Sequence, residues 1–166
     1  MPTANIHASC VVLERAGIPL GAPENAGVLI TGPSGSGKSD LALRLIERGA
    51  MLVADDRVDV FVREDSLWAC CPPALTGLLE IRGIGVVSLP SRREASIVLA
   101  VQLTTNHDIQ RFPETEYFTL PTELTASCTK PVPLIRLLSF ESSAPAKAIA
   151  ATAAFAHALF RDGRKP

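Results

Sequence analysis

A glycine-rich segment between a strand pattern and a helix pattern constrains this chain more than any other feature. Residues 32–39 fit the pattern G-x-x-x-x-G-K-[ST] at every position. The continuously apolar residues 28–31 before it predict a strand that is covered on both faces. The apolar residues of 38–48 recur at helical spacing, and Gly49 follows where a helix would end. Strand, loop and helix in this order predict a phosphate-binding loop in an α/β domain.

The composition of the loop suits the binding of a nucleotide. Its glycines permit the positive backbone dihedrals that turn N–H groups toward phosphate oxygens, and the helix N-terminus adds partial positive charge. Lys38 would bridge the outer phosphates of ATP, and the Ser39 hydroxyl would bind Mg²⁺. The alternative is a glycine-rich turn with a chance Lys-Ser pair, which the two flanking patterns disfavour. The predicted cofactor-binding residues are Gly32, Pro33, Ser34, Gly35, Ser36, Gly37, Lys38 and Ser39.

Two adjacent carboxylates follow the next predicted strand. Residues 51–54 are apolar, and Asp55 and Asp56 come directly after them. The carboxyl end of that strand should lie beside the phosphate loop, where open α/β sheets bind ligands. Neighbouring side chains at a strand end point in different directions, so one of the two would hold Mg²⁺ while the other faces an attacking nucleophile. The alternative is a solvated Asp-Asp turn.

The remaining patterns predict one domain over 1–166, with a core of about 7–160 and a frayed tail at 161–166. The run 78–87 is interrupted by two glycines and two charges, so we expect a loop held close to another part of the molecule. An alanine-rich run predicts a helix over 145–160, and 15–27 reads as a connecting loop. Strands are predicted at 7–14, 28–31, 51–54, 58–63, 67–71, 96–103 and 132–138, the fourth and fifth forming a hairpin.

Composition and charge exclude several classes of function. The 16 basic and 17 acidic side chains leave a net charge of -1, which gives no long-range field to attract a nucleic acid, so we expect no nucleic-acid partner. No run approaches the roughly 18 apolar residues of a membrane span, and the N-terminus lacks a basic leader, so we expect a cytoplasmic protein with no membrane partner. Four cysteines without Cys-x-x-Cys spacing predict reduced thiols rather than a metal site.

Three blocks together resemble a known family. Residues 32–39, 52–58 and 79–85 follow the order and nearly the spacing found in the catalytic domain of bacterial HPr kinase/phosphorylase. The third block, which contains Glu-Ile-Arg-Gly, discriminates best, because many unrelated nucleotide-binding proteins carry the first. The resemblance implies a P-loop-containing α/β domain of the phosphoenolpyruvate-carboxykinase-like kinase type, with a mixed sheet. It also implies Mg²⁺-dependent phosphorylation of a serine of HPr, a small phosphocarrier protein, or of a paralogue, with ATP as donor and phosphorolysis as the reverse reaction.

The resemblance assigns roles to single residues. It makes Lys38 a phosphate contact and Ser39 a Mg²⁺ ligand. Asp56 corresponds to the residue that accepts the serine proton, so Asp55 is expected to serve Mg²⁺, and Glu80 corresponds to a second Mg²⁺ ligand. His7 matches an active-site histidine, although a lone histidine at a strand start is more often structural. Arg111 is the match for a late catalytic arginine, and the family implies a homo-oligomer, a hexamer.

Three departures from the family pattern leave alternatives open. The loop between His7 and Gly32 is longer than usual, and 140–147 stand where the family has a basic, glycine-containing loop associated with dephosphorylation. Longer members also carry an N-terminal domain for which this chain has no room. These departures favour kinase over phosphorylase activity. The rival interpretations are a small-molecule kinase or hydrolase on the same loop and an ATP-binding regulatory sensor without phosphotransfer.

Overall fold

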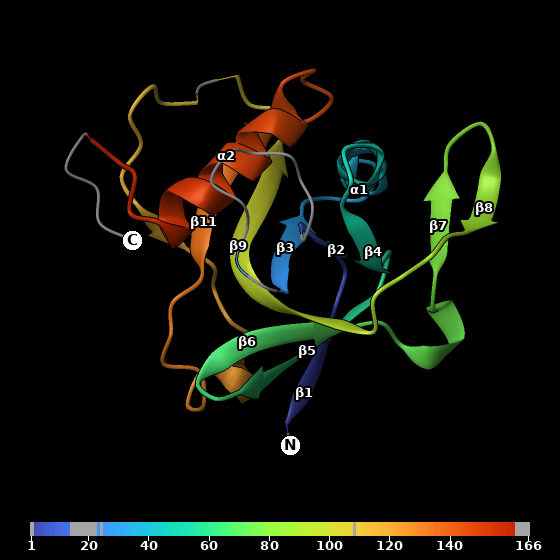
Figure 1. Ribbon diagram of the computed structural model, residues 1–166, viewed down its shortest axis with the longest axis horizontal. Helices are drawn as coiled ribbons and strands as arrows, with labels where there is room; N and C mark the ends of the chain where they lie inside the picture. The colour runs from blue at the N-terminus through green and yellow to red at the C-terminus, as the bar shows by residue number, and fades with distance from the viewer. Residues whose placement is uncertain (1, 14–22, 24, 108, 162–166) are drawn as a thin grey trace.

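A mixed sheet and two helices make up most of the chain. The computed structural model describes residues 2–13, 23, 25–107 and 109–161 (Figure 1). Within these residues the nine-stranded sheet consists of β1 (Thr3–Ile6), β2 (Ser9–Val12), β3 (Ala26–Thr31), β4 (Met51–Ala54), β5 (Val58–Arg63), β6 (Ser66–Cys70), β9 (Glu94–Thr104), β10 (Glu116–Tyr117) and β11 (Pro133–Leu138). The other elements are the helices α1 (Lys38–Glu47) and α2 (Ala144–Ala156), the hairpin β7 (Leu78–Ile81) and β8 (Gly85–Ser88), and the 3-10 turns η1 (Pro73–Leu75) and η2 (Thr122–Leu124).

The long strand β9 curls the sheet (Figure 1). Its first residues pair antiparallel with β6, its middle pairs parallel with β3, and its last residues pair parallel with β11. The strands therefore follow the order β1-β5-β6-β9-β3-β2-β4, with β11 joining the far half of β9. The expected mixture of a parallel centre with antiparallel extensions is confirmed.

The position of β2 places the two predicted functional segments at one edge. This strand lies between β3 and β4 and runs antiparallel to both. Consequently β3 and β4 point the same way, and their carboxyl ends meet at the same edge of the sheet. The phosphate loop follows β3, and the Asp55–Asp56 pair follows β4, so the loop and the carboxylates lie side by side as predicted.

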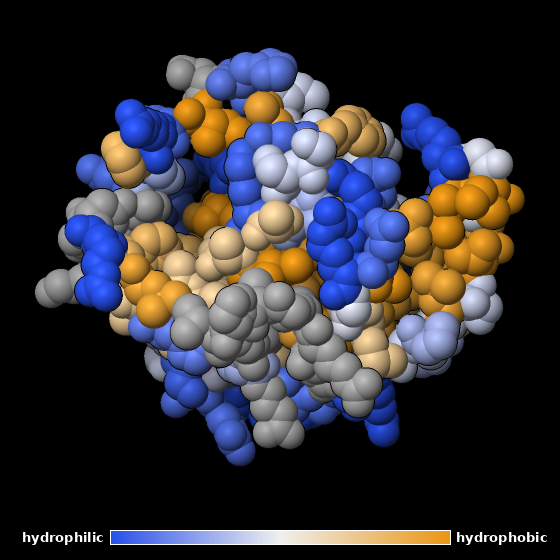
Figure 2. Space-filling view, turned by 45° about the horizontal axis from the view of Figure 1, so that its top comes forward, coloured by the Kyte–Doolittle hydropathy of each residue, from blue (hydrophilic) through white to orange (hydrophobic). Residues whose placement is uncertain are grey.

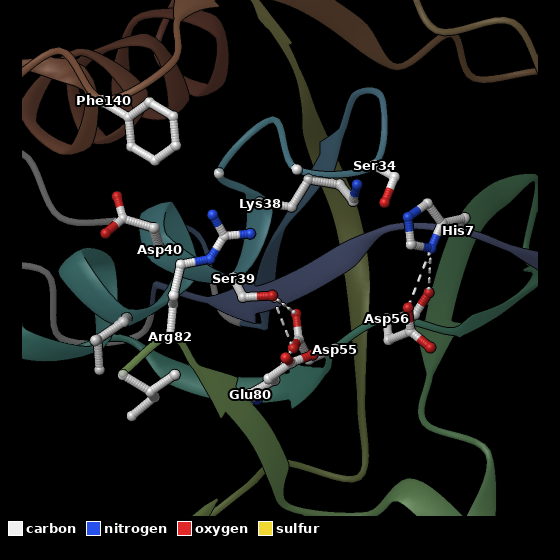
Figure 3. A pocket seen from close by; sticks show the side chains of 14 residues that line it. His7, Ser34, Lys38, Ser39, Asp40, Asp55, Asp56, Glu80, Arg82 and Phe140 are labelled. Atoms are coloured by element: carbon white, nitrogen blue, oxygen red, sulfur yellow. Dashed lines mark hydrogen bonds and ion pairs between the residues drawn. The ribbon is translucent and has the colours of Figure 1, made fainter. Parts of the chain in front are cut away.

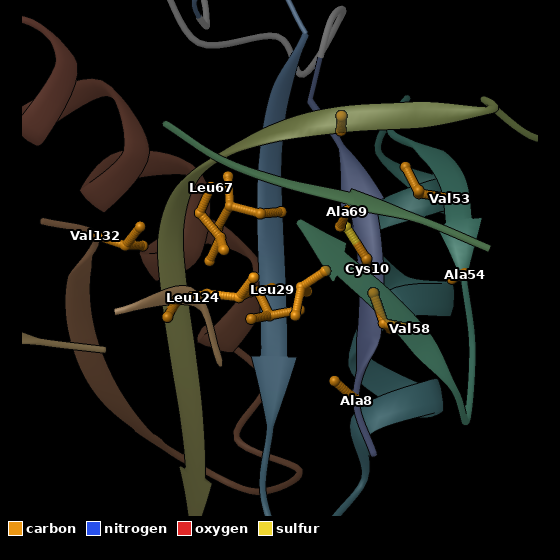
Figure 4. Close-up of a cluster of buried hydrophobic side chains, with 14 of the residues drawn as sticks. Ala8, Cys10, Leu29, Val53, Ala54, Val58, Leu67, Ala69, Leu124 and Val132 are labelled. Carbon is orange, nitrogen blue, oxygen red and sulfur yellow. The ribbon is translucent and has the colours of Figure 1, made fainter. Parts of the chain in front are cut away.

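Both faces of the central strand β3 are buried, which explains its continuous apolar sequence. Val28 and Ile30 pack with α1 and α2 in one cluster. Leu29 points to the opposite face, where it packs with side chains from the curled part of the sheet, including Val58 of β5 and Leu67 of β6 (Figure 4). The two helices thus cover one face, and the sheet covers its other face by folding over itself.

Three sequence predictions need correction. Of the strand predicted over 7–14, only Ser9–Val12 form a strand, β2, and His7 lies in the bend before it, because the preceding β1, which was not predicted, leaves the central sheet to pair with β5. The loop predicted over 78–87 is wrong, because β7 and β8 form a hairpin whose turn uses Gly83 in the left-handed conformation. The helix predicted over 145–160 ends at Ala156. Most of the predicted 15–27 loop and of the 161–166 tail lies outside the described residues.

The surface shows one further feature of the hairpin. Ile84 and Val86 are 73% and 65% exposed. The β7–β8 hairpin lies on the right of Figure 1, and Figure 2 shows hydrophobic surface on that side of the molecule. All four cysteines are free thiols, as predicted, and burial raises the pKa of Cys10. Among the described residues, no helix has the length and apolar character needed to cross a membrane.

Candidate functional site

A pocket of about 420 Å³ opens at the carboxyl edge of β3 and β4 (Figure 3). The phosphate loop and the start of α1 form one wall, the Asp55–Asp56 turn and the bend at His7 form another, and the β7–β8 hairpin completes it. The lining residues are His7, Ser34, Gly35, Gly37, Lys38, Ser39, Asp40, Leu43, Asp55, Asp56, Glu80, Ile81, Arg82 and Phe140. Five segments that are distant in the sequence therefore meet at one cavity.

The phosphate loop has the backbone form that its glycines predict. Gly35 and Gly37 have φ values of 76° and 90°, and Gly37 is the residue directly before α1. A side chain at Gly37 would be strained by this dihedral, so glycine is required for the loop to enter the helix here. Ser36 places a buried hydroxyl in this loop, and it has no hydrogen-bond partner among the described residues. A buried hydroxyl of this kind fits a loop that binds the oxygens of a ligand.

Lys38 is held within the loop. Its side chain is only 6% exposed, and Nζ donates hydrogen bonds to the carbonyl oxygens of Gly32 and Pro33, each at 3.0 Å. Burial lowers the pKa of Lys38 from its ordinary value of 10.5, while Asp55 and Asp56 act in the opposite direction. The loop therefore concentrates one cation at the point where the anionic groups of a nucleotide would lie.

Asp55 is the most connected side chain of the site. Its carboxylate is 5% exposed and accepts hydrogen bonds from Ser39 Oγ at 2.9 Å to each oxygen. Ser9 Oγ of β2 donates to the same carboxylate at 2.5 Å, and the backbone N–H of Glu80 lies 3.4 Å from it. One carboxylate thus joins the central sheet, the first turn of α1 and the β7–β8 hairpin.

Asp56 turns away from this network. Its backbone is left-handed, with a φ of 65°, and its side chain points away from the Asp55 carboxylate. The Asp56 side chain is 66% exposed. His7 Nδ1 lies 2.9 Å from the Asp56 carbonyl oxygen and 3.3 Å from its Oδ1. Both neighbours are acceptors, so Nδ1 carries the hydrogen. Figure 3 shows the other ring nitrogen turned toward Ser34 and the pocket.

The remaining predicted residues divide into two groups. Glu80 lines the pocket from the hairpin, and Arg82 extends its guanidinium toward Asp40 and Lys38 (Figure 3). Arg111, in contrast, does not line this pocket, and its guanidinium lies 5.2 Å from the centre of the Phe112 ring. The structure therefore brings the other predicted residues together at the pocket or, for Gly32, Pro33 and Ser36, within the phosphate loop that borders it, and it leaves Arg111 outside.

Ser9 and Phe140 belong to the site but were not identified from the sequence. Ser9 is a fully buried hydroxyl in a strand of otherwise apolar residues, and that contrast is a weak signal of a buried polar contact. Phe140 carries no sequence signal, because its place in the pocket depends on a left-handed turn after β11.

Comparison with known proteins identifies the family. The family model of the HPr Serine kinase C-terminal domain matches residues 24–154. The chain belongs to this family. The solved structure of the Hpr(Ser) kinase/phosphatase from Coxiella burnetii is similar over 96% of this chain and 99% of that chain, with a TM-score of 0.67 and 26% sequence identity. The fold class expected from the sequence, a P-loop-containing domain of the phosphoenolpyruvate-carboxykinase-like type, is confirmed.

Curated members of the HPr kinase family match a shorter part of the chain. The HPr kinase/phosphorylase of Lacticaseibacillus casei (strain BL23) is 47% identical over 85 residues, which cover 46% of this chain and 27% of that protein. The HPr kinase/phosphorylase of Burkholderia cenocepacia (strain HI2424) is 46% identical over 106 residues, which cover 58% of this chain and 31% of that protein. The matched region of the chain thus spans about a third or less of these relatives.

The buried ammonium of Lys38 leads to a prediction on pH dependence. A folded-state pKa below 10.5 means that the unfolded chain binds more protons between the two values, so stability rises with pH in that window. Wild-type protein should therefore gain stability relative to Lys38→Met as the pH rises through the folded-state pKa of Lys38 toward 10.5. Urea unfolding of both proteins at several pH values measures this difference. Parallel profiles would show that the ammonium is not desolvated by the fold.

Proposed function

We propose that this chain is a Mg²⁺-dependent protein-serine kinase that transfers the γ-phosphoryl group of ATP to a serine of HPr or of an HPr paralogue. The observation that carries the proposal is the division of the two adjacent carboxylates. Asp55 is buried against the hydroxyl of Ser39 in the phosphate loop, whereas Asp56 is exposed beside His7 at the open side of the same pocket. Family membership supports the same function, since the relatives are named HPr kinase/phosphorylase.

The phosphate loop would hold the donor. Backbone N–H groups of the loop and the N-terminus of α1 would bind the phosphate oxygens, as glycine-rich loops before helices do. Lys38 would exchange its two carbonyl partners for phosphate oxygens, and the orphan hydroxyl of Ser36 would gain an acceptor. Phosphoryl transfer requires mainly positioning and charge stabilisation, which a rigid loop with one buried cation provides.

The oxygen ligands beside the loop fit Mg²⁺. This ion prefers hard oxygen donors and usually takes one or two protein groups, with phosphates and water completing its coordination. Ser39 and Asp55 offer a hydroxyl and a carboxylate in direct contact, and Glu80 offers a second carboxylate from the hairpin. When bound, the ion would neutralise charge on the transferred phosphoryl group.

Asp56 would accept the proton of the attacking serine. A bond forms between the serine oxygen and the γ-phosphorus while the bond to the bridging oxygen breaks, so that ADP leaves and the serine proton passes to the Asp56 carboxylate. His7 donates to Asp56 and so would hold the carboxylate toward the pocket. In phosphorolysis, an oxygen of inorganic phosphate would attack the phosphorus of phosphoserine, the bond to the serine oxygen would break so that pyrophosphate forms, and the protonated Asp56 carboxyl would return a proton to the serine oxygen. The roles of Arg111 and of a hexamer remain predictions from the family resemblance.

The general-base role predicts the effect of removing one charge. Asp56→Asn is nearly isosteric and leaves the Asp55 network intact, so ATP should still bind while phosphoserine formation on HPr slows by about 10²-fold or more. Mass spectrometry of HPr incubated with ATP and Mg²⁺ measures the rate. Asp59→Asn makes the same chemical change in β5, outside the pocket, and should leave the rate unchanged.

Three outcomes would contradict the proposal or a part of it. Undiminished transfer by Asp56→Asn would remove the general-base assignment. A wild-type chain that binds ATP yet labels neither HPr nor a paralogue would favour a sensor, and labelling of a small metabolite instead would favour a small-molecule kinase.

The proposed metal ligands predict coupled effects. If Ser39 and Glu80 both contact Mg²⁺, then Ser39→Ala and Glu80→Gln should each raise the Mg²⁺ concentration that transfer requires. The double variant should lose less than the sum of the two single losses, because both substitutions weaken one site. Magnesium titrations of the four proteins test this expectation, and strictly additive losses would place Glu80 outside the metal site.

A further inference from the structure

Phe140 lies at the end of the pocket away from the proposed acceptor. In Figure 3, His7 and Asp56 lie on one side, Lys38 and the phosphate loop lie between, and Phe140 lies on the far side above Asp40. The transferred phosphoryl group must lie near Asp56 for that carboxylate to receive the serine proton. The part of the donor beyond its phosphates would therefore extend toward Phe140.

The ring of Phe140 is available for contact with a ligand. It is 62% exposed, and among the described residues no aromatic ring or guanidinium stacks on it. The ring lies against the phosphate loop, because a Cβ atom added to Gly37 would come within 2.9 Å of Phe140 Cε1. Leu43 of α1 adds a second apolar side chain to the pocket lining.

The backbone conformation that positions the Phe140 ring is strained. Phe140 has a φ of 62°, which is left-handed and unfavourable for an aromatic residue. Such strain persists only where neighbouring contacts determine the conformation. Before Phe140, the Ser139 N–H donates to the Thr104 carbonyl at 2.9 Å, and after it, Arg44 Nη1 donates to the Glu141 carbonyl at 2.8 Å. The turn is thus fixed from both sides, and it presents an exposed aromatic ring beside the loop.

We propose that Phe140 stacks on the base of a nucleoside triphosphate and so makes this site select a nucleotide over an inorganic polyphosphate donor. This inference rests on the proposed function and adds the recognition of the donor. Stacking suits the arrangement because every base has a π face, and an exposed aromatic ring gains contact area from it without a specific hydrogen bond. Lys38 and the loop backbone would contact only the phosphates of either donor, so they would bind both donors alike.

Two ligands separate recognition of the base from recognition of the phosphates. Isothermal titration with Mg²⁺ compares ATP with inorganic triphosphate on wild-type protein and on Phe140→Ala. The variant should bind ATP about tenfold more weakly and should bind inorganic triphosphate within about twofold of wild type. Phe140→Trp should retain ATP binding, since it keeps an aromatic face. Tyr117→Ala removes another exposed ring, outside the pocket, and should change neither affinity.

Phe140→Gly is a second variant that removes the ring, and it controls for any change of fold in Phe140→Ala. Glycine accepts the left-handed dihedral at this position without strain. Phe140→Gly should reproduce the selective loss of ATP affinity. Equal losses of ATP and triphosphate affinity would show that Phe140 only shapes the phosphate loop, and unchanged ATP affinity would show that it does not contact the base. Either result overturns this inference and leaves the kinase proposal standing. A wild-type chain that binds neither ligand would overturn both.

Discussion

The buried carboxylate of Asp55 is the interaction on which the site depends. A carboxylate that is 5% exposed is costly unless hydrogen bonds compensate for the lost water. Ser9, which is 46 residues away in the sequence, and Ser39 supply those hydrogen bonds from β2 and α1. Folding of the sheet and formation of the phosphate loop are therefore linked through one charge. The proposed function needs a metal ligand at this position. The Asp55 carboxylate therefore contributes both to the stability of the fold and to the proposed function.

The sheet topology explains why two neighbouring aspartates can differ so strongly. Because β2 separates β3 from β4, the end of β4 lies beside the first turn of α1, and Asp55 continues the direction of its strand into that contact. The left-handed dihedral of Asp56 then reverses the chain toward β5. Its side chain meets His7 because β1 and β5 pair, which brings the bend before β2 next to the turn after β4. Asp55 consequently lies on the buried side of the pocket, and the adjacent residue Asp56 lies on its open side.

Local sequence patterns predicted the parts of the site that depend on short-range physics. The glycines of 32–37, the amphipathic helix after them and the acidic pair at the end of an apolar strand could all be identified from residue type and spacing. The hairpin at 78–88 was missed, because its two glycines read as interruptions when Gly83 in fact serves the turn between paired strands. The contacts of His7, Ser9 and Phe140 depend on pairing between distant segments, or on a strained turn, and no local pattern encodes them. Arg111 was matched by resemblance alone, and it lies outside the pocket lining.

The central claim is that Asp55 serves the metal side of the pocket and Asp56 the acceptor side. Electron paramagnetic resonance with Mn²⁺ as a substitute for Mg²⁺ tests it directly, using Asp55→Asn and Asp56→Asn with ATP present. Circular dichroism first establishes that both variants keep the fold. The account predicts that Asp55→Asn loses most ATP-dependent Mn²⁺ binding while Asp56→Asn retains it. Retention by Asp55→Asn together with loss by Asp56→Asn would contradict the account.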